Sequence, residues 1–336
     1  MSKMSHEMLT YRATIHPYSA TRSPWQADML FGHLCWLIRY EEGESALLEF
    51  LEFYRRGEPP MLFSNGFPGN WLPRPLLPPP AMPADQPKHA RLQARHQTHA
   101  TENQPWLDLE AFNMLRSGRP LPLATTRPRL SSERTIFKQP VNRLSGSSTI
   151  PTSPTDDPDQ DTRYPATELA YLDRTTVHPA GLDISMYVRV RDTIWARRAE
   201  NLLQRLSRSG YGAKKSSGYG HFEAIWERFA GFDADPPDAN GFISLSHWTP
   251  ARSDPTDGFY NLMVKYGKLG EELATSANPF KFPLIMLTAG SAFYADAPIR
   301  DWYGRLVTGI APVNPGVVQY AFAFALPARL TGEPSA

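Results

Sequence analysis

Apolar and polar residues alternate along several short stretches of the chain, which is the pattern of a strand with one buried face. The clearest alternations cover residues 9–18 in the first half and 182–190 in the second. Shorter apolar runs predict further strands at 61–66, 219–226, 242–246, 262–264, 284–287, 292–294 and 317–326. The segment 71–76 contains two prolines, which cannot donate to a sheet ladder, so we expect it at a sheet edge.

Three other segments place apolar residues three and four positions apart, as amphipathic helices do. They cover roughly residues 24–38, 44–55 and 195–207. The first follows the pair Ser23-Pro24, so we expect Ser23 to cap this helix and Pro24 to be its first residue.

The order of these elements predicts an α+β fold. In the second half, a strand, a helix, a glycine-rich loop and another strand follow one another, as in a ferredoxin-like (RRM-like) βαββαβ unit. The first half fits the same unit with long insertions, and 336 residues suit two domains. We therefore expect an N-terminal domain at 1–180 and a C-terminal domain at 181–336 that contains the loop 210–220.

Proline marks where the insertions are expected. The chain has 33 prolines, about twice the average usage, and they cluster at 59–87 and 120–165. Residues 78–106 are polar and rich in Pro, Gln and His, and residues 149–162 are rich in Pro, Ser, Thr and Asp. We place the two Pro-rich insertions at about 78–105 and 145–165.

Charge and cysteine content limit the function classes. With 35 basic and 34 acidic residues the net charge is +1, so any nucleic-acid site must be a local patch. The single cysteine, Cys35, excludes a disulfide framework and a multi-thiolate metal site. The first residues lack the apolar core of a signal peptide, and no apolar run is long enough to span a membrane. We expect a cytoplasmic protein without membrane contact.

The glycine-rich stretch 210–220 has the composition of an anion-binding loop. Glycine allows close backbone approach, lysine adds charge, serine adds hydroxyl donors, and tyrosine offers a ring for stacking on a base. The residues concerned are Gly210, Tyr211, Gly212, Lys214, Lys215, Ser216, Ser217, Gly218, Tyr219 and Gly220. On composition alone, a flexible turn between two elements remains an alternative.

The loop does not match the nucleotide-phosphate motifs. The spacing of its glycines around Lys214 and Lys215 fits neither a Walker loop nor a dinucleotide fingerprint, and no hydrolase or zinc-protease motif occurs elsewhere. We therefore expect no cofactor and no metal, although 78–106 contains three histidines (His89, His96 and His99). By residue type, the candidates for metal-free RNA cleavage are His16, His33, His178 and His221, and their spacing selects none of them.

A second basic and polar concentration covers residues 127–148. Arginines alternate there with hydroxyl and amide side chains, a mixture that suits contacts to phosphate and sugar. A solvated loop explains the same composition equally well.

Four stretches together resemble the RAMP superfamily of CRISPR effector proteins, in particular the handle-capping subunit (Cas "five" group) of type III-A Csm complexes. They are 23–36 with its Leu-Phe-Gly, 63–75 with Leu-Pro-Arg-Pro, 141–146 with Asn142 and Arg143, and the glycine-rich loop 210–220. The segment 278–281 and the strand at 317–326 lie behind the loop in the same order. The long Pro-rich insertions and the doubled lysine depart from the family pattern.

This resemblance implies two ferredoxin-like domains and a non-catalytic role in antiviral defence. The protein would hold the 5′ handle of crRNA and join the large polymerase-domain subunit to the backbone RAMP subunits of a prokaryotic effector complex. The glycine-rich loop would contact the handle, together with Asn142 and Arg143 from the first domain.

The alternative is a metal-independent crRNA-processing endoribonuclease, which shares the RAMP fold. In that class the glycine-rich loop usually lies near the C-terminus, whereas more than a hundred residues follow it here.

Overall fold

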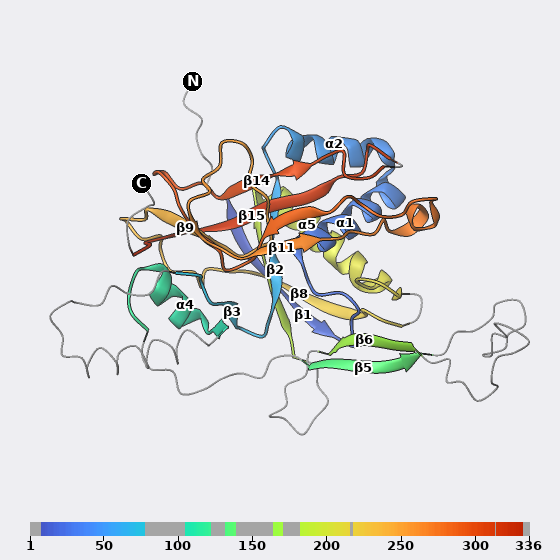
Figure 1. Ribbon diagram of the computed structural model, residues 1–336, viewed down its shortest axis with the longest axis horizontal. Coiled ribbons are helices and arrows are strands. Elements are labelled where there is room, and N and C mark those ends of the chain that lie inside the picture. Colours follow the sequence, from blue (N-terminus) through green and yellow to red (C-terminus); the bar gives the residue numbers. More distant parts are fainter. Residues whose placement is uncertain are drawn as a thin grey trace, which may run out of the picture.

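The structure is a computed structural model that describes residues 8–77, 105–121, 132–138, 164–170, 182–215, 218–312 and 314–331. It combines helices with β-sheets in which all named strands pair antiparallel (Figure 1). The α+β class predicted from the sequence is therefore confirmed.

The first sheet has four strands in the order β2-β7-β1-β8. The chain enters it as β1, α1, α2 and β2, and returns to it as β7, α5 and β8. This strand order is that of a ferredoxin-like βαββαβ unit, with α2 added after the first helix. The bounds are β1 Leu9–Pro17, α1 Ala27–Glu42, α2 Glu44–Arg55, β2 Met61–Pro68, β7 Ile184–Val190, α5 Thr193–Ser209 and β8 Phe222–Arg228.

This pairing corrects the predicted boundary between residues 180 and 181. Strands from both sides of that boundary share one sheet, because β7 pairs along its length with β1, as in Tyr11↔Val188, and also with β2. The loop 210–220 therefore lies within the unit that begins at β1. An alternating pattern indicates a half-buried strand but not its pairing partner. The sequence therefore could not show that β7 pairs with β1 and β2.

The second sheet has five strands in the order β10-β13-β9-β15-β14, and a separate hairpin, β11–β12, has the 3₁₀ helix η2 between its strands. Their bounds are β9 Gly241–Ser244, β10 Gly258–Phe259, β11 Leu262–Lys265, η2 Glu271–Thr275, β12 Leu284–Leu287, β13 Ala292–Tyr294, β14 Trp302–Val307 and β15 Gln319–Ala328. The strand β14 was not predicted.

The remaining elements lie beside the predicted insertions. They are β3 Leu72–Pro73 paired with β4 Trp106–Leu107, α4 Leu109–Arg116, and β5 Ser132–Lys138 paired with β6 Tyr164–Ala170. The helix α4 was not predicted. Nearly all of 78–105 and 145–165 lies outside the described residues.

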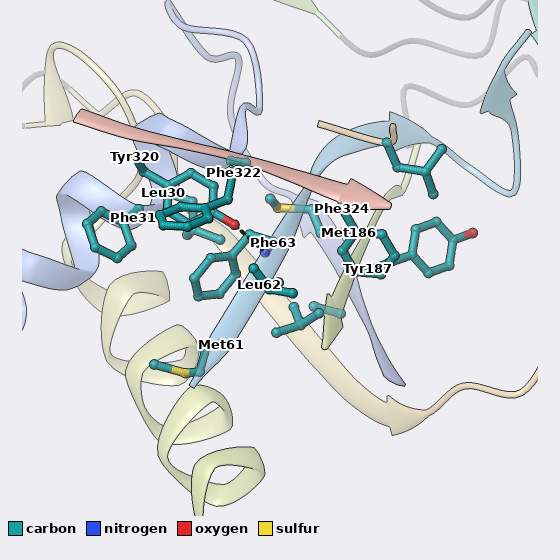
Figure 2. Close-up of a cluster of buried hydrophobic side chains, with 14 of the residues drawn as sticks. Leu30, Phe31, Met61, Leu62, Phe63, Met186, Tyr187, Tyr320, Phe322 and Phe324 are labelled. Atoms are coloured by element: carbon teal, nitrogen blue, oxygen red, sulfur yellow. Dashed lines mark hydrogen bonds between the residues drawn. The ribbon is translucent and has the colours of Figure 1, made fainter. Parts of the chain in front are cut away.

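The two sheets share one hydrophobic core, which Figure 2 shows in part. Side chains from α1 and β2 (Phe31 and Phe63) pack there against Tyr320 and Phe322 of β15. The backbone N–H of Phe63 also donates to the Tyr320 hydroxyl over 3.1 Å. This continuous core contains side chains from both sheets and from α5 and β8, the two elements that the loop 210–220 connects.

Within the described residues, no helix combines the length and the apolar character that crossing a membrane requires.

Candidate nucleic-acid interface

The loop 210–220 joins α5 to β8, which is the outer strand of the first sheet (Figure 1). Ser216 and Ser217 lie outside the described residues, so the structure describes the two ends of the loop and part of its middle. We call 210–212 together with Gly220 the stem, and 213–218 the turn.

Backbone hydrogen bonds close the stem. The N–H of Tyr211 donates to the carbonyl of Gly220 over 2.8 Å, and the N–H of Gly220 donates to the carbonyl of Ala20 over 3.1 Å. Gly220 has a φ of +72°, and a Cβ at this position would lie 1.9 Å from the Tyr211 carbonyl oxygen. Only glycine fits such a position, so its role here is close packing of the loop on itself.

Tyr211 anchors the stem in the protein core. Its side chain is fully buried, and its ring stacks on Trp25 with centroids 3.8 Å apart and an interplanar angle of 7°. Its hydroxyl donates to the carbonyl of Pro24 over 2.8 Å and accepts from the N–H of Gln26 over 3.1 Å. The expectation that Tyr211 could stack on a base is thus corrected: both faces and the hydroxyl of its ring are occupied by protein.

The same contacts explain why the first helix starts later than predicted. It begins at Ala27 after the extended residue Gln26, and the Ala27 N–H donates to the Asn65 side chain over 3.1 Å. The carbonyls of Pro24 and Trp25 accept from the Tyr211 hydroxyl and from the Gly66 N–H. These long-range bonds hold the segment extended, so Ser23 is not the N-cap.

His33 of α1 holds the other side of the stem. Its Nε2 accepts a hydrogen bond from the N–H of Gly212 over 3.0 Å. Burial, together with the nearby charge of Lys215, lowers the pKa of His33 from 6.5 to about 4, while Glu271 acts in the opposite direction. The ring is therefore neutral at physiological pH, as an acceptor must be. The sequence offers His33 as one of four candidate histidines for metal-free RNA cleavage, and this contact to the loop was not predicted.

The turn, by contrast, faces solvent. Lys214 is exposed with a φ of +66°, and Gly218 is exposed with a φ of +83° and open space where a Cβ would lie. Lys215 is partly exposed, and its Nζ forms an ion pair with Glu271 over 2.7 Å. The N–H of Gly218 donates to the carbonyl of Lys215 over 3.0 Å, which closes the turn.

Tyr219 lies between these two regions. Its side chain is half-buried, and the guanidinium of Arg22 lies over its ring at 5.8 Å from the centroid. The ring packs against this cation beside the loop.

Four predicted contact residues and one candidate histidine lie outside the described residues: Ser216, Ser217, Asn142, Arg143 and His178. Of the other candidate histidines, His16 pairs with Asp183 and His221 is exposed at the start of β8. In the part of the chain that the structure describes, no three His, Cys, Asp or Glu side chains are grouped as they would be around a metal ion.

Comparisons with known proteins agree with this architecture. No family model and no curated protein sequence matches the chain. Solved structures do match it over almost its whole length. One is a chain of a Csm1–Csm4 cassette in complex with cA4, with a TM-score of 0.60, 16% identity, and coverage of 96% of this chain and 100% of that chain.

A second match comes from a Csm1–Csm4 cassette in complex with pppApA, with a TM-score of 0.57, 19% identity and the same coverage. A third comes from a Csm3–Csm4 subcomplex of the type III-A CRISPR-Cas interference complex, with a TM-score of 0.54, 14% identity, and coverage of 95% of this chain and 99% of that chain. The resemblance to type III-A RAMP proteins seen in the sequence is thus confirmed in three dimensions, and the chain has the fold of the Csm4 subunit.

Proposed function

We propose that this chain is a non-catalytic, RNA-binding subunit of a type III CRISPR effector complex in the prokaryotic cytoplasm. It holds the 5′ handle of crRNA and links the large polymerase-domain subunit to the backbone RAMP subunits. The observation that carries this proposal is the fold, which the chain shares over 96% of its length with a chain of a Csm1–Csm4 cassette.

The RNA side of the proposal rests on the turn. Lys214 is exposed, and Lys215 is partly exposed and forms an ion pair with Glu271, which a phosphate can replace. The stem fixes the position of both lysines through Tyr211 and His33, so that less order has to be gained when a phosphate binds. Ser216, Ser217, Asn142 and Arg143 remain proposed contacts on their sequence alone.

The protein side of the proposal is supported by the β11–β12 hairpin. Among the described residues, seven of the twelve exposed large hydrophobic side chains fall between 260 and 285: Tyr260, Leu262, Val264, Tyr266, Phe280, Phe282 and Ile285. Val264 and Ile285 are paired across the hairpin. Grouped apolar exposure of this kind marks interaction surfaces, so we assign this hairpin to a partner subunit.

The strand order of the second sheet supports a second ferredoxin-like domain. Four of its strands, β15-β9-β13-β10, stand in the order 4-1-3-2 of a βαββαβ unit if β9 is the first strand. In this interpretation the two helices have been replaced, the first by the segment 245–257 and the second by a segment that contains β14.

The non-catalytic part of the proposal is consistent with the histidines that can be placed. His33 uses its Nε2 to hold Gly212, and His16 is engaged with Asp183. The exposed His221 is the residue to test for the endoribonuclease alternative.

The experiment measures binding and cutting together. The purified chain is titrated into labelled handle RNA and into a scrambled RNA of the same composition, and full repeat RNA is incubated with it and examined on a gel. We expect tighter binding of the handle RNA and intact repeat RNA. Equal binding of both RNAs would overturn handle recognition, and specific cutting that His221→Ala abolishes would establish the endoribonuclease instead.

A further inference from the structure

A shallow hollow lies beside the glycine-rich loop, between the ends of β1, α5 and β8. Its volume is about 370 Å³, and it is lined by Tyr18, Ser207, Arg208, His221, Phe222 and Glu223. These residues come from the end of β1, the last turn of α5 and the start of β8. Arg208 precedes the first glycine of the loop by two residues and His221 directly follows the last one, so both ends of the loop border the hollow.

The ring of Tyr18 lines this hollow and is exposed to solvent. Tyr18 is 70% exposed. Its backbone N–H donates to the carbonyl of His221 over 2.8 Å, and its hydroxyl donates to Glu223 Oε2 over 2.5 Å. These two bonds fix the position of the ring without burying it. A ring that is oriented by hydrogen bonds yet exposed is suited to stacking on a flat ligand.

The charges around the ring indicate which ligand fits. Arg208 is exposed and can meet a phosphate, as can Lys214 of the neighbouring turn. Glu223 is exposed as well, and its carboxylate only accepts hydrogen bonds. A carboxylate repels phosphate but accepts from the amino group of a base, as acidic side chains do with cytosine N4. A hollow with a ring, one cation and one carboxylate therefore matches a whole nucleotide better than a free anion.

We propose that this hollow is a nucleotide subsite of the chain. The base of one RNA nucleotide stacks on Tyr18 and donates its amino group to Glu223, while Arg208 contacts the adjoining phosphate. The subsite prefers a base with an exocyclic amino group over uracil. This inference rests on the proposed RNA-binding role of the glycine-rich loop and adds the reading of a base to it.

Three variants of the full chain test the stacking in titrations with labelled handle RNA. Tyr18→Leu removes the ring, and we expect binding about tenfold weaker. Tyr18→Phe keeps the ring but loses the hydroxyl bond that orients it, so its affinity should lie between those of wild type and Tyr18→Leu. Ile194→Ala removes an apolar side chain that is 76% exposed at the opposite end of α5 and should leave the affinity unchanged. Equal affinities of wild type and Tyr18→Leu would overturn the subsite.

A fourth variant tests the preference for a base. Wild type should bind oligo(C) more tightly than oligo(U) of equal length, and Glu223→Gln should reduce this ratio, because an amide offers a donor as well as an acceptor. A ratio that is the same in both proteins would overturn the base contact.

The outcome for the subsite can be separated from that for the loop. If Lys214→Ala/Lys215→Ala weakens handle binding while Tyr18→Leu does not, the loop binds RNA and the subsite does not exist. If Tyr18→Leu weakens binding and the double lysine variant does not, the subsite stands and the loop has been assigned wrongly. Failure of wild type to bind the handle RNA would overturn both proposals.

Discussion

The stem and the turn of the glycine-rich loop differ in almost every physical respect, although they are adjacent in a stretch of eleven residues. The stem is buried: Tyr211 is stacked on Trp25, and Gly220 is packed against a carbonyl. The turn faces solvent and contains Lys214, Lys215 and Gly218. A Cβ added to Gly218 would have open space around it.

The difference shows that one motif can serve two tasks. In the stem, glycine is required because the backbone folds tightly on itself. In the turn, glycine only eases the left-handed backbone conformation of an exposed residue. Changes in the stem should therefore act on the stability of the protein, and changes in the turn on its affinity for RNA.

Replacing the buried tyrosine should have the largest effect. Tyr211→Ala removes a fully buried ring and two hydrogen bonds, and we expect a loss of about 4 kcal/mol in the free energy of unfolding. Tyr219→Ala, in the same loop but half-buried, should cost less than about 1 kcal/mol. Denaturant unfolding measures both values, and similar losses for the two variants would contradict the division.

Substitution of Gly220 in the stem should destabilise the protein more than substitution of Gly218 in the turn. Gly220→Ala places a Cβ 1.9 Å from the Tyr211 carbonyl oxygen, so backbone must move, and we expect a cost of about 3 kcal/mol. Gly218→Ala meets open space and should cost only the left-handed conformation, about 1 kcal/mol. Thermal unfolding of the pair is sufficient, and a Gly220→Ala protein as stable as wild type would show that the stem is not as tightly packed as described.

The stability of the stem should depend on pH through His33. Since the folded pKa of His33 is lowered from 6.5 to about 4, the neutral ring stabilises the fold fully above pH 6.5. Between pH 6.5 and 4 the unfolded chain binds a proton that the folded chain does not. As the pH is lowered through this range, the free energy of unfolding therefore falls by up to about 1.4 kcal/mol per pH unit.

His33→Gln keeps an acceptor for Gly212 and should show a smaller pH dependence in this range. His247, whose pKa burial lowers similarly to about 4, is present in both proteins, so the difference between them isolates His33. Parallel pH profiles of wild type and His33→Gln would rule out the neutral histidine as a support of the stem.

The smallest effect is expected at the acidic partner of the turn. Glu271 pairs with Lys215, so Glu271→Gln should free this lysine and tighten RNA binding about two- to fivefold. The control is Glu272→Gln, because Glu272 lies near Arg39 instead, at 3.5 Å. Equal affinities of the two variants would mean that the ion pair does not compete with RNA.

Elements that depend on local pattern could be predicted from the sequence. The alternations at 9–18 and 182–190 correspond to β1 and β7, and the helical spacing at 44–55 corresponds to α2. The glycine-rich loop was correctly placed between a helix and a strand. These features are encoded by residues only a few positions apart.

Features that depend on distant partners were missed for a physical reason. Tyr211 is buried because it meets Trp25, 186 residues earlier in the chain, and no local pattern contains that information. Ser23-Pro24 has the local form of a helix start, but long-range hydrogen bonds keep this segment extended. The pairing of β7 with β1 spans the insertions, and this is why the domain boundary was drawn in the wrong place.

The most direct test of the central claim, that the turn contacts RNA phosphates, is the salt dependence of handle binding. The affinities of wild type and Lys214→Ala/Lys215→Ala are measured over a series of salt concentrations, with denaturant unfolding to show that both proteins are equally stable. If both lysines contact phosphates, the slope of log affinity against log salt should fall by about 1.4 in the variant. An unchanged slope and affinity in an equally stable variant would contradict the account.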